Sequence, residues 1–329
     1  MQFDDQAQSE FEGQYKERCE RFRILVCVDG DDECYRGLEY AARMGGSRAD
    51  CDIVLLHVRP IDQCLASGGL QVRLARENML SWGLELPALR YLRDGLSMLA
   101  AKQEVGTDWV SVDLHTDVEG DPLGDHKTEY RHPSGRKIIL KLKTSPDAAS
   151  GILDQYELGP YNLIILGSGA LGRSRLRATL APNTAEKVAL HAPCSVLVAR
   201  SLVAGNGHLV CVDGSPKALE AAMEEGKIAA RFSDPMLSAI CVATDDNMIS
   251  EAQEILDFLE ETLKKELNFR LKATYVRVGS IVDEIVKVGQ DYSVIVLGGS
   301  TKSTLQRMVT SSIPLDVMRK ASNSVMIIR

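Results

Sequence analysis

Six consecutive residues, LVCVDG, occur twice in this chain, first at 25–30 and again at 209–214. Each occurrence is followed by a stretch in which apolar residues recur at helical spacing. Two later pairs of segments correspond in the same order: LIILGSG at 163–169 with VIVLGGS at 294–300, and APCSVLVAR at 192–200 with ASNSVMIIR at 321–329. The shared order of these matches predicts two copies of one domain.

The second copy shows the expected local structure most clearly. Short apolar runs are expected to be strands: 209–212, 237–243, 271–278, 294–297 and 325–328. Between the second and third runs, apolar residues at helical spacing predict an amphipathic helix: Ile255, Leu256, Leu259, Leu263 and Leu267. Alternating strands and helices predict an α/β fold, in which a mostly parallel sheet carries helices on both faces.

The first copy is longer than the second. It spans 138 positions from Leu25 to Leu163, against 85 from Leu209 to Val294, so 53 residues are inserted. We expect a hairpin over 128–144 that turns around HPSG. The predicted organisation is an N-terminal arm at 1–21, a first domain at 22–201 with insertions near 61–95 and 120–144, a linker at 202–208, and a second domain at 209–329.

Composition excludes several classes of function. The formal net charge of −8 argues against binding to nucleic acid or to an anionic membrane. No stretch is long and apolar enough to span a bilayer, and the acidic N-terminus does not resemble a signal peptide, so a cytoplasmic protein is expected. The eight cysteines contain no C-x-x-C pair and the six histidines show no paired spacing, so no metal site is predicted.

With its two V-D-G strand ends, its glycine loops and its A-P-C-S-V-L-V segment, the chain resembles the universal stress protein family in tandem form. The resemblance implies, for each copy, a five-stranded mostly parallel sheet of the adenine nucleotide alpha hydrolase-like type. Family members pair through their last strand. The resemblance therefore implies that 195–200 pairs with 324–329 inside one chain, as a pseudo-dimer, and that two chains form a homodimer.

Nucleotide-binding members of the family carry G-x-x-G, nine further residues, and then Gly followed by Ser or Thr. In the first copy Gly169 and Gly172 match, whereas Pro182 and Asn183 stand in the last two positions. An acid after the first strand, Asp29, is suited to bind a ribose hydroxyl. Proline offers no N–H to a phosphate, so this copy departs from the pattern.

The second copy departs from the same pattern at other positions. Gly298 matches the first glycine and Ser312 the final serine, but Thr301 and Ser311 replace the two remaining glycines. Lys302 is placed to hold an anion by charge. The residues that the resemblance implies for ligand binding in the two copies are Asp29, Gly169, Gly172, Asn183, Asp213, Gly298, Lys302, Ser311 and Ser312.

Rival chemistries lack the required context. The glycines Gly167, Gly169 and Gly172 have the spacing of a dinucleotide fingerprint, but they follow the fourth expected strand instead of the first. We interpret Gly167 as the end of that strand. Ser168 lies outside a G-x-S-x-G elbow. His57 is interpreted as a satisfied strand-end histidine. No catalytic residue is predicted, and the chain is not expected to be an enzyme beyond slow ATP hydrolysis.

Two functions remain open from the sequence. One is a stress-response regulator that binds ATP or another adenine nucleotide at degenerate sites, with Mg²⁺ entering only together with the nucleotide. The other is a nucleotide-independent interaction module, in which the insertions and the acidic arm present a surface to an unknown protein partner. The two hypotheses differ in what occupies the crevice at the ends of the strands.

Overall fold

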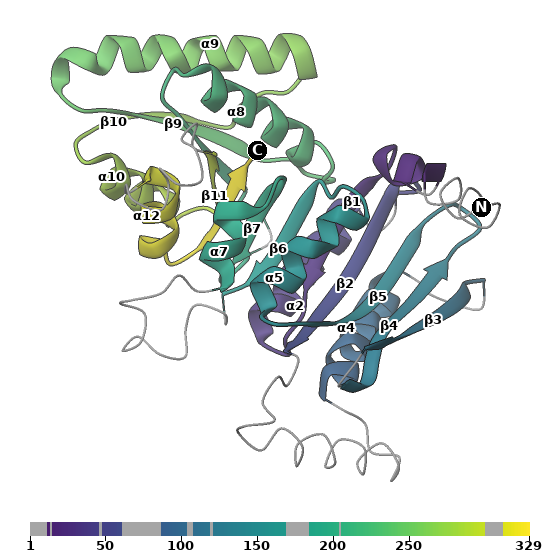
Figure 1. Ribbon diagram of the computed structural model, residues 1–329. Helices are drawn as coiled ribbons and strands as arrows, with labels where there is room; N and C mark the ends of the chain where they lie inside the picture. Colours follow the sequence, from purple (N-terminus) through teal and green to yellow (C-terminus); the bar gives the residue numbers. More distant parts are fainter. Residues whose placement is uncertain are drawn as a thin grey trace, which may run out of the picture. The chain divides into compact units, whose positions relative to one another are not determined.

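The computed structural model describes residues 12–329 apart from 14, 46–47, 61–86, 104–107, 119–120, 169–183, 204 and 300–311. Contacts divide the chain into two compact units, residues 1–167 and 168–329 (Figure 1). The division does not coincide with the sequence repeat, because the last helix and strand of the first copy belong to the second unit. None of the helices in the described ranges is long and apolar enough to cross a membrane.

In the described part of the first unit, six strands lie in the order β6-β1-β2-β5-β4-β3. Their bounds are β1 (Phe22–Cys27), β2 (Cys51–Pro60), β3 (Val110–Val118), β4 (Asp121–Arg131), β5 (Lys137–Ser145) and β6 (Leu163–Gly167). The pairs among β6, β1, β2 and β5 are parallel, and β4 and β3 are added antiparallel. The central strands β1 and β6 are buried along most of their length, as expected where helices cover both faces of a sheet.

Helices flank this sheet on its two sides: α2 (Asp32–Gly45) and α4 (Pro87–Gln103), and α5 (Ala148–Leu153) followed by the 3-10 turn η2 (Asp154–Leu158). In α4, Gly95 lies against Leu55, whereas Gly151 of α5 lies against Val58. Because side chains alternate along a strand, Leu55 and Val58 point to opposite faces of β2. The predicted arrangement, with helices on both faces of a mostly parallel sheet, is therefore confirmed.

The second unit has the strand order β10-β9-β8-β11-β12-β7. Its strands are β7 (Ser195–Ala199), β8 (His208–Val212), β9 (Leu237–Ala243), β10 (Thr274–Val278), β11 (Val294–Gly298) and β12 (Ser324–Ile328). Its helices are α7 (Thr184–His191), α8 (Pro216–Ala229), α9 (Ile249–Leu267), α10 (Ile281–Gly289) and α12 (Ile313–Lys320), with a 3-10 turn η3 (Asp246–Met248). The predicted amphipathic helix is α9, whose Leu256, Leu259 and Leu263 are buried.

Comparison of the two copies shows which strands are added to the first one. β5 pairs in parallel with β2, as β10 pairs with β9, so β5 is the repeat's own strand. The predicted hairpin is present as β4 and β5, joined by a turn in which the Gly135 N–H donates to the His132 carbonyl over 2.9 Å. Within the expected insertion at 120–144, the added material is therefore β4, which together with β3 extends the sheet.

The strand pairing implied by the resemblance is present inside the second unit. β7 runs antiparallel to β12, with Leu197 opposite Met326. The contacts at the two ends are reciprocal: the Ser324 hydroxyl accepts from the Arg200 N–H over 2.9 Å, and the Ser195 hydroxyl accepts from the Arg329 N–H over 3.3 Å. The last strands of the two copies are thus joined by a local twofold arrangement.

Candidate functional site

In the second copy, a cavity of about 450 Å³ opens at the carboxyl ends of β8 and β11. This edge of an open parallel sheet is where α/β folds bind ligands. One wall of the cavity is apolar and is formed by Ile240, Val242, Ile281, Ile285 and Leu297. The opposite rim is polar and carries Asp213, Ser215, Lys217 and Ser312. The cavity therefore offers an apolar compartment beside a small group of polar side chains, as small-molecule sites do.

A tight turn after β8 places the polar rim. Asp213 Oδ1 accepts a hydrogen bond from the Ser215 N–H over 3.0 Å. Gly214 has φ +78, and a Cβ there would lie 2.8 Å from Ile255 Cδ1, so the turn requires glycine. Ser215 then caps α8 by accepting from the Ala218 N–H over 3.2 Å. This geometry sets Lys217 in the first turn of α8, at the mouth of the cavity.

The end of β11 and the start of α12 complete the cavity. A Cβ on Gly298 would lie 3.3 Å from both Ala221 Cβ and the Lys217 carbonyl oxygen, so glycine lets the strand end approach α8 closely. Ser312 is the N-cap of α12, and its side chain makes no capping hydrogen bond. The N–H groups at a helix start carry partial positive charge and lack intrahelical partners. These groups, like Lys217, suit a negatively charged ligand.

The first copy builds the same turn with a different charge. Asp29 Oδ1 accepts from the Asp31 N–H over 3.1 Å, and Gly30 has φ +87 beneath the ring of Tyr91. The residues that follow the turn are Asp31, Asp32 and Glu33, in the positions of Ser215, Pro216 and Lys217. The first copy therefore presents a row of carboxylates where the second presents a lysine and a hydroxyl. Carboxylates at this position repel an anionic ligand.

The structure brings together three of the residues implied by the resemblance, namely Asp213, Gly298 and Ser312, in one cavity. Asp29 occupies the corresponding turn of the first copy. The remaining implied residues, Gly169, Gly172, Asn183, Lys302 and Ser311, lie outside the described residues. Gly167 ends β6 as expected, and by that position it is the counterpart of Gly298, which ends β11. The motif spacing instead aligned Gly298 with Gly169, which is two residues further along the chain.

Sequence reasoning missed two parts of this cavity. Lys217 did not stand out, although a direct comparison of DGSPK with DGDDE would have shown a lysine in one copy where the other has a glutamate. The apolar wall draws on β9, α10 and β11, and no local pattern indicates that these segments converge.

Other reactive groups near the two turns are held in unreactive states. His57 Nδ1 lies 2.6 Å from the Val28 carbonyl oxygen, and burial lowers the pKa of the imidazole, so the interpretation as a satisfied strand-end histidine is confirmed. Burial raises the pKa of the Cys34 thiol to about 12, which leaves almost no thiolate at neutral pH. Within the described residues, no group of three or more His, Cys, Asp or Glu side chains could hold a metal ion.

Comparison with known proteins gives consistent matches. The model of the universal stress protein family matches the chain twice, over residues 20–200 and 208–329. A universal stress protein from Archaeoglobus fulgidus DSM 4304 is structurally similar, with 17% sequence identity and a TM-score of 0.59, over 93% of this chain and 96% of that one. A protein of the same description from Pseudomonas aeruginosa UCBPP-PA14 has 14% identity and a TM-score of 0.55, over 95% and 94%. No curated protein sequence matches the chain.

Proposed function

Since this chain belongs to the universal stress protein family, whose domain it contains twice, we propose that it is a stress-response regulator that binds an adenine nucleotide in its second copy. The observation that carries the proposal is the cavity of about 450 Å³ at the ends of β8 and β11. Its size lies in the ordinary range for small-molecule sites. Its residues include Asp213, Gly298 and Ser312, to which the family resemblance assigns ligand contacts.

Each part of a nucleotide has a suitable counterpart in this cavity. The apolar wall with Ile240 and Ile285 suits the flat face of a purine. Asp213, an exposed carboxylate with Oδ1 already engaged by the turn, is suited to accept from a ribose hydroxyl. Lys217 and the start of α12 suit the phosphates, because both supply positive charge. Mg²⁺ would arrive with the nucleotide, on its phosphate oxygens.

We assign nucleotide binding to the second copy only. The first copy shares the turn and its glycine, Gly30. After that turn, however, it has Asp31, Asp32 and Glu33 where the second copy has Ser215, Pro216 and Lys217. Three carboxylates next to Asp29 would raise the free energy of a bound phosphate, and the first copy offers no lysine at these positions. We therefore expect one nucleotide per chain, with the first copy serving the fold and the contacts to other molecules.

Titration calorimetry with ATP and Mg²⁺ tests the proposal. We expect a stoichiometry near one per chain. We also expect stabilisation of the second unit by about 2.7 kcal/mol at a nucleotide concentration 100 times the dissociation constant. Thermal denaturation in the presence of ATP measures that stabilisation, and adenosine serves as a control without phosphates. Absence of heat and of any thermal shift at millimolar ATP would contradict the proposal.

A protein-interaction role is favoured by a separate observation on the first unit. The edge strand β3 exposes a row of apolar side chains on one face, with 64% of Val110, 46% of Val112 and 57% of Leu114 accessible. Native proteins usually protect a sheet edge with charge, proline or a covering element, so an exposed apolar row indicates a contact surface. This role is compatible with nucleotide binding elsewhere in the chain.

The double variant Val112→Lys, Leu114→Lys tests this second role. Proteins that co-purify with the wild-type chain through β3 should be lost from the variant, because two charges now interrupt the apolar row. Ser111→Lys, on the opposite face of the same strand, is the matched control and should retain them. Quantitative mass spectrometry of the captured proteins gives the comparison. Identical protein lists for the wild-type chain and the double variant would contradict the role.

A further inference from the structure

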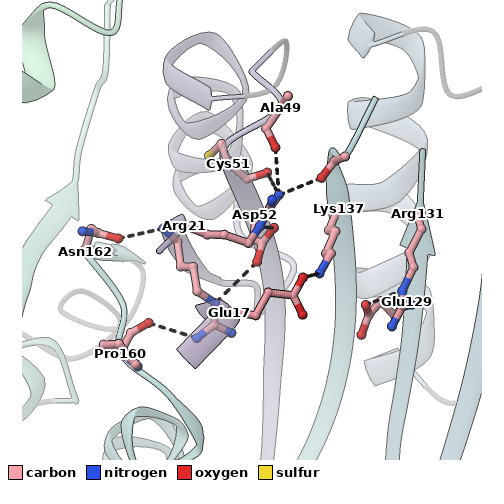
Figure 2. A network of polar contacts seen from close by, with 12 residues as sticks. Glu17, Arg21, Ala49, Cys51, Asp52, Glu129, Arg131, Lys137, Pro160 and Asn162 are labelled. Carbon is pink, nitrogen blue, oxygen red and sulfur yellow. Dashed lines mark hydrogen bonds and ion pairs between the residues drawn. The ribbon is translucent and has the colours of Figure 1, made fainter. Parts of the chain in front are cut away.

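The lysines on one face of the β4–β5 hairpin differ in the chemical groups that they contact. Lys127 and Lys141 stand directly opposite each other in the antiparallel register, and Lys143 lies two residues further along the same face. Lys127 Nζ is 2.8 Å from Glu129 Oε2, and Lys143 Nζ is 2.6 Å from Asp125 Oδ2. Lys137, at the other end of β5, pairs with Glu17 (Figure 2). These three lysines each have a carboxylate.

Lys141 has a neutral partner instead. Its Nζ lies 3.0 Å from Gln155 Oε1, and no carboxylate within the described ranges lies at ion-pair distance from it. Gln155 is buried, and its Nε2 donates to the Gly151 carbonyl over 3.3 Å, which fixes the amide oxygen toward the lysine. The surroundings of Lys141 therefore provide a neutral acceptor for an amine N–H. The carboxylates of Asp125 and Glu129, on the same face of β4, are already paired with Lys143 and Lys127.

Burial and nearby cations act on this amine in the same direction. Desolvation, together with the charges of Arg23, Lys127, Arg18 and Lys143, lowers the pKa of Lys141 to about 7. At neutral pH about half of the amine is then unprotonated, whereas less than about one part in a thousand is unprotonated for a lysine with the ordinary pKa of about 10.4. A neutral amine is the nucleophilic form of lysine.

We propose that Lys141 is a site of reversible carbamylation by carbon dioxide. The Nζ lone pair attacks the carbon of CO₂ and forms an N–C bond, while the electron pair of one C=O π bond moves onto oxygen. One N–H proton leaves to water. The product is a carbamate that carries one negative charge and retains one N–H, which continues to donate to Gln155 Oε1.

The charge change explains why this lysine is selected from the lysines on this face. Like charges directly opposite each other on an antiparallel pair destabilise it, and Lys127 opposes Lys141. A carbamate at Lys141 converts that repulsion into attraction and places an anion among the cations Arg23, Lys127 and Lys143. CO₂ is small and uncharged, so the partly exposed Lys141 side chain is accessible to it. Lys127 and Lys143 are already paired with Glu129 and Asp125, so a carbamate on either lysine would not bring a comparable gain in attraction.

Chemical trapping in the full chain tests the proposal. The protein is equilibrated with ¹³CO₂ at pH 7.5, the carbamate is esterified with a trialkyloxonium salt, and peptides are analysed by mass spectrometry. We expect the labelled adduct on Lys141 at more than about tenfold the level on Lys127 or Lys143, because of its larger neutral fraction. Equal labelling of all three lysines, or no adduct on Lys141, would overturn the proposal.

Two variants provide a second readout in the intact protein. Lys141→Arg should remove one ¹³C carbamate resonance from the NMR spectrum and leave that of the α-amino group, whereas Lys143→Arg should leave both unchanged. Circular dichroism checks that both variants are folded. At a fixed concentration of dissolved CO₂, the wild-type signal should increase as the pH rises through about 7, because deprotonation exposes the lone pair. An identical set of carbamate resonances in the wild-type protein and in Lys141→Arg would refute the assignment.

Discussion

Replacing Lys217 by glutamate should weaken ATP binding to the second copy by about a hundredfold. The substitution removes a cation placed at the mouth of the cavity, and a hydrogen bond to a charged group contributes about 1.5–3 kcal/mol. It also introduces a carboxylate at the position that Glu33 occupies in the first copy. The segment after the turn of the second copy therefore becomes more negatively charged. Calorimetric dissociation constants for the wild-type chain and the variant give the ratio.

Lys264→Glu is the matched control for this experiment. Lys264 is exposed on α9 and does not line the cavity, so the same change in net charge should alter ATP affinity less than about twofold. Lys217→Arg, which keeps the positive charge, should retain most of the binding. If Lys217→Glu binds ATP as tightly as the wild-type chain, the phosphates do not lie at the start of α8.

The repeat made most of the fold predictable from the sequence. A short apolar run alone does not distinguish a strand from a buried helix segment. A run such as Leu209–Val212 is easier to assign, because it recurs at the same place in the other copy. The pairing of the last strands could be inferred only through the family resemblance, because β7 and β12 are more than a hundred residues apart in the chain. Contacts at that separation leave no local pattern.

The boundary of the insertion was harder to predict for a physical reason. β5 reads KIILKLKTS, and its alternating lysines resemble a solvent-exposed hairpin strand. In the structure that face is half-buried, and its charges are held by carboxylates on other segments, such as Glu17 for Lys137. Alternation identified the strand correctly but could not show that one polar face is packed within the domain.

The site was predicted in part for a similar reason. The family resemblance aligns Asp213, Gly298 and Ser312 with ligand-contacting positions, and in the structure these three residues line one cavity. Lys217 lies outside that motif, and it lines the cavity because the turn after β8 places it in the first turn of α8. The sequences DGSPK and DGDDE already contain the charge difference between the copies, but only the structure shows that Lys217 lines the cavity.

Asp52→Ala should destabilise the first unit by about 3–5 kcal/mol, because it leaves a buried charge without its partner. Asp52 is buried between two guanidinium groups, with Oδ1 2.6 Å from Arg21 Nε and Oδ2 3.6 Å from Arg23 Nε. Arg21 also donates to the carbonyls of Ala49, Cys51 and Gly135, so the group ties the starts of β1 and β2 to the hairpin turn (Figure 2). Arg23 is almost completely buried and cannot regain water when the carboxylate is removed.

Urea denaturation followed by tryptophan fluorescence measures this loss, because Trp109 packs against the ring of His132 within the first unit and the second unit contains no tryptophan. Asp108→Ala, at an exposed aspartate, should change the free energy of unfolding by less than about 0.5 kcal/mol. A loss for Asp52→Ala no larger than that of the control would show that Asp52 does not compensate the buried Arg23 charge.

The double variant Asp52→Ala, Arg23→Met separates the two contributions to this loss. Burial raises the pKa of Asp52 despite the neighbouring arginines, so the carboxylate is itself unfavourable in this site. If the destabilisation arises from the unpaired Arg23 charge, removing that charge should recover about half of the lost stability or more, as an apolar side chain tolerates burial. If it arises from the severed contacts of Arg21, the double variant should be no more stable than Asp52→Ala.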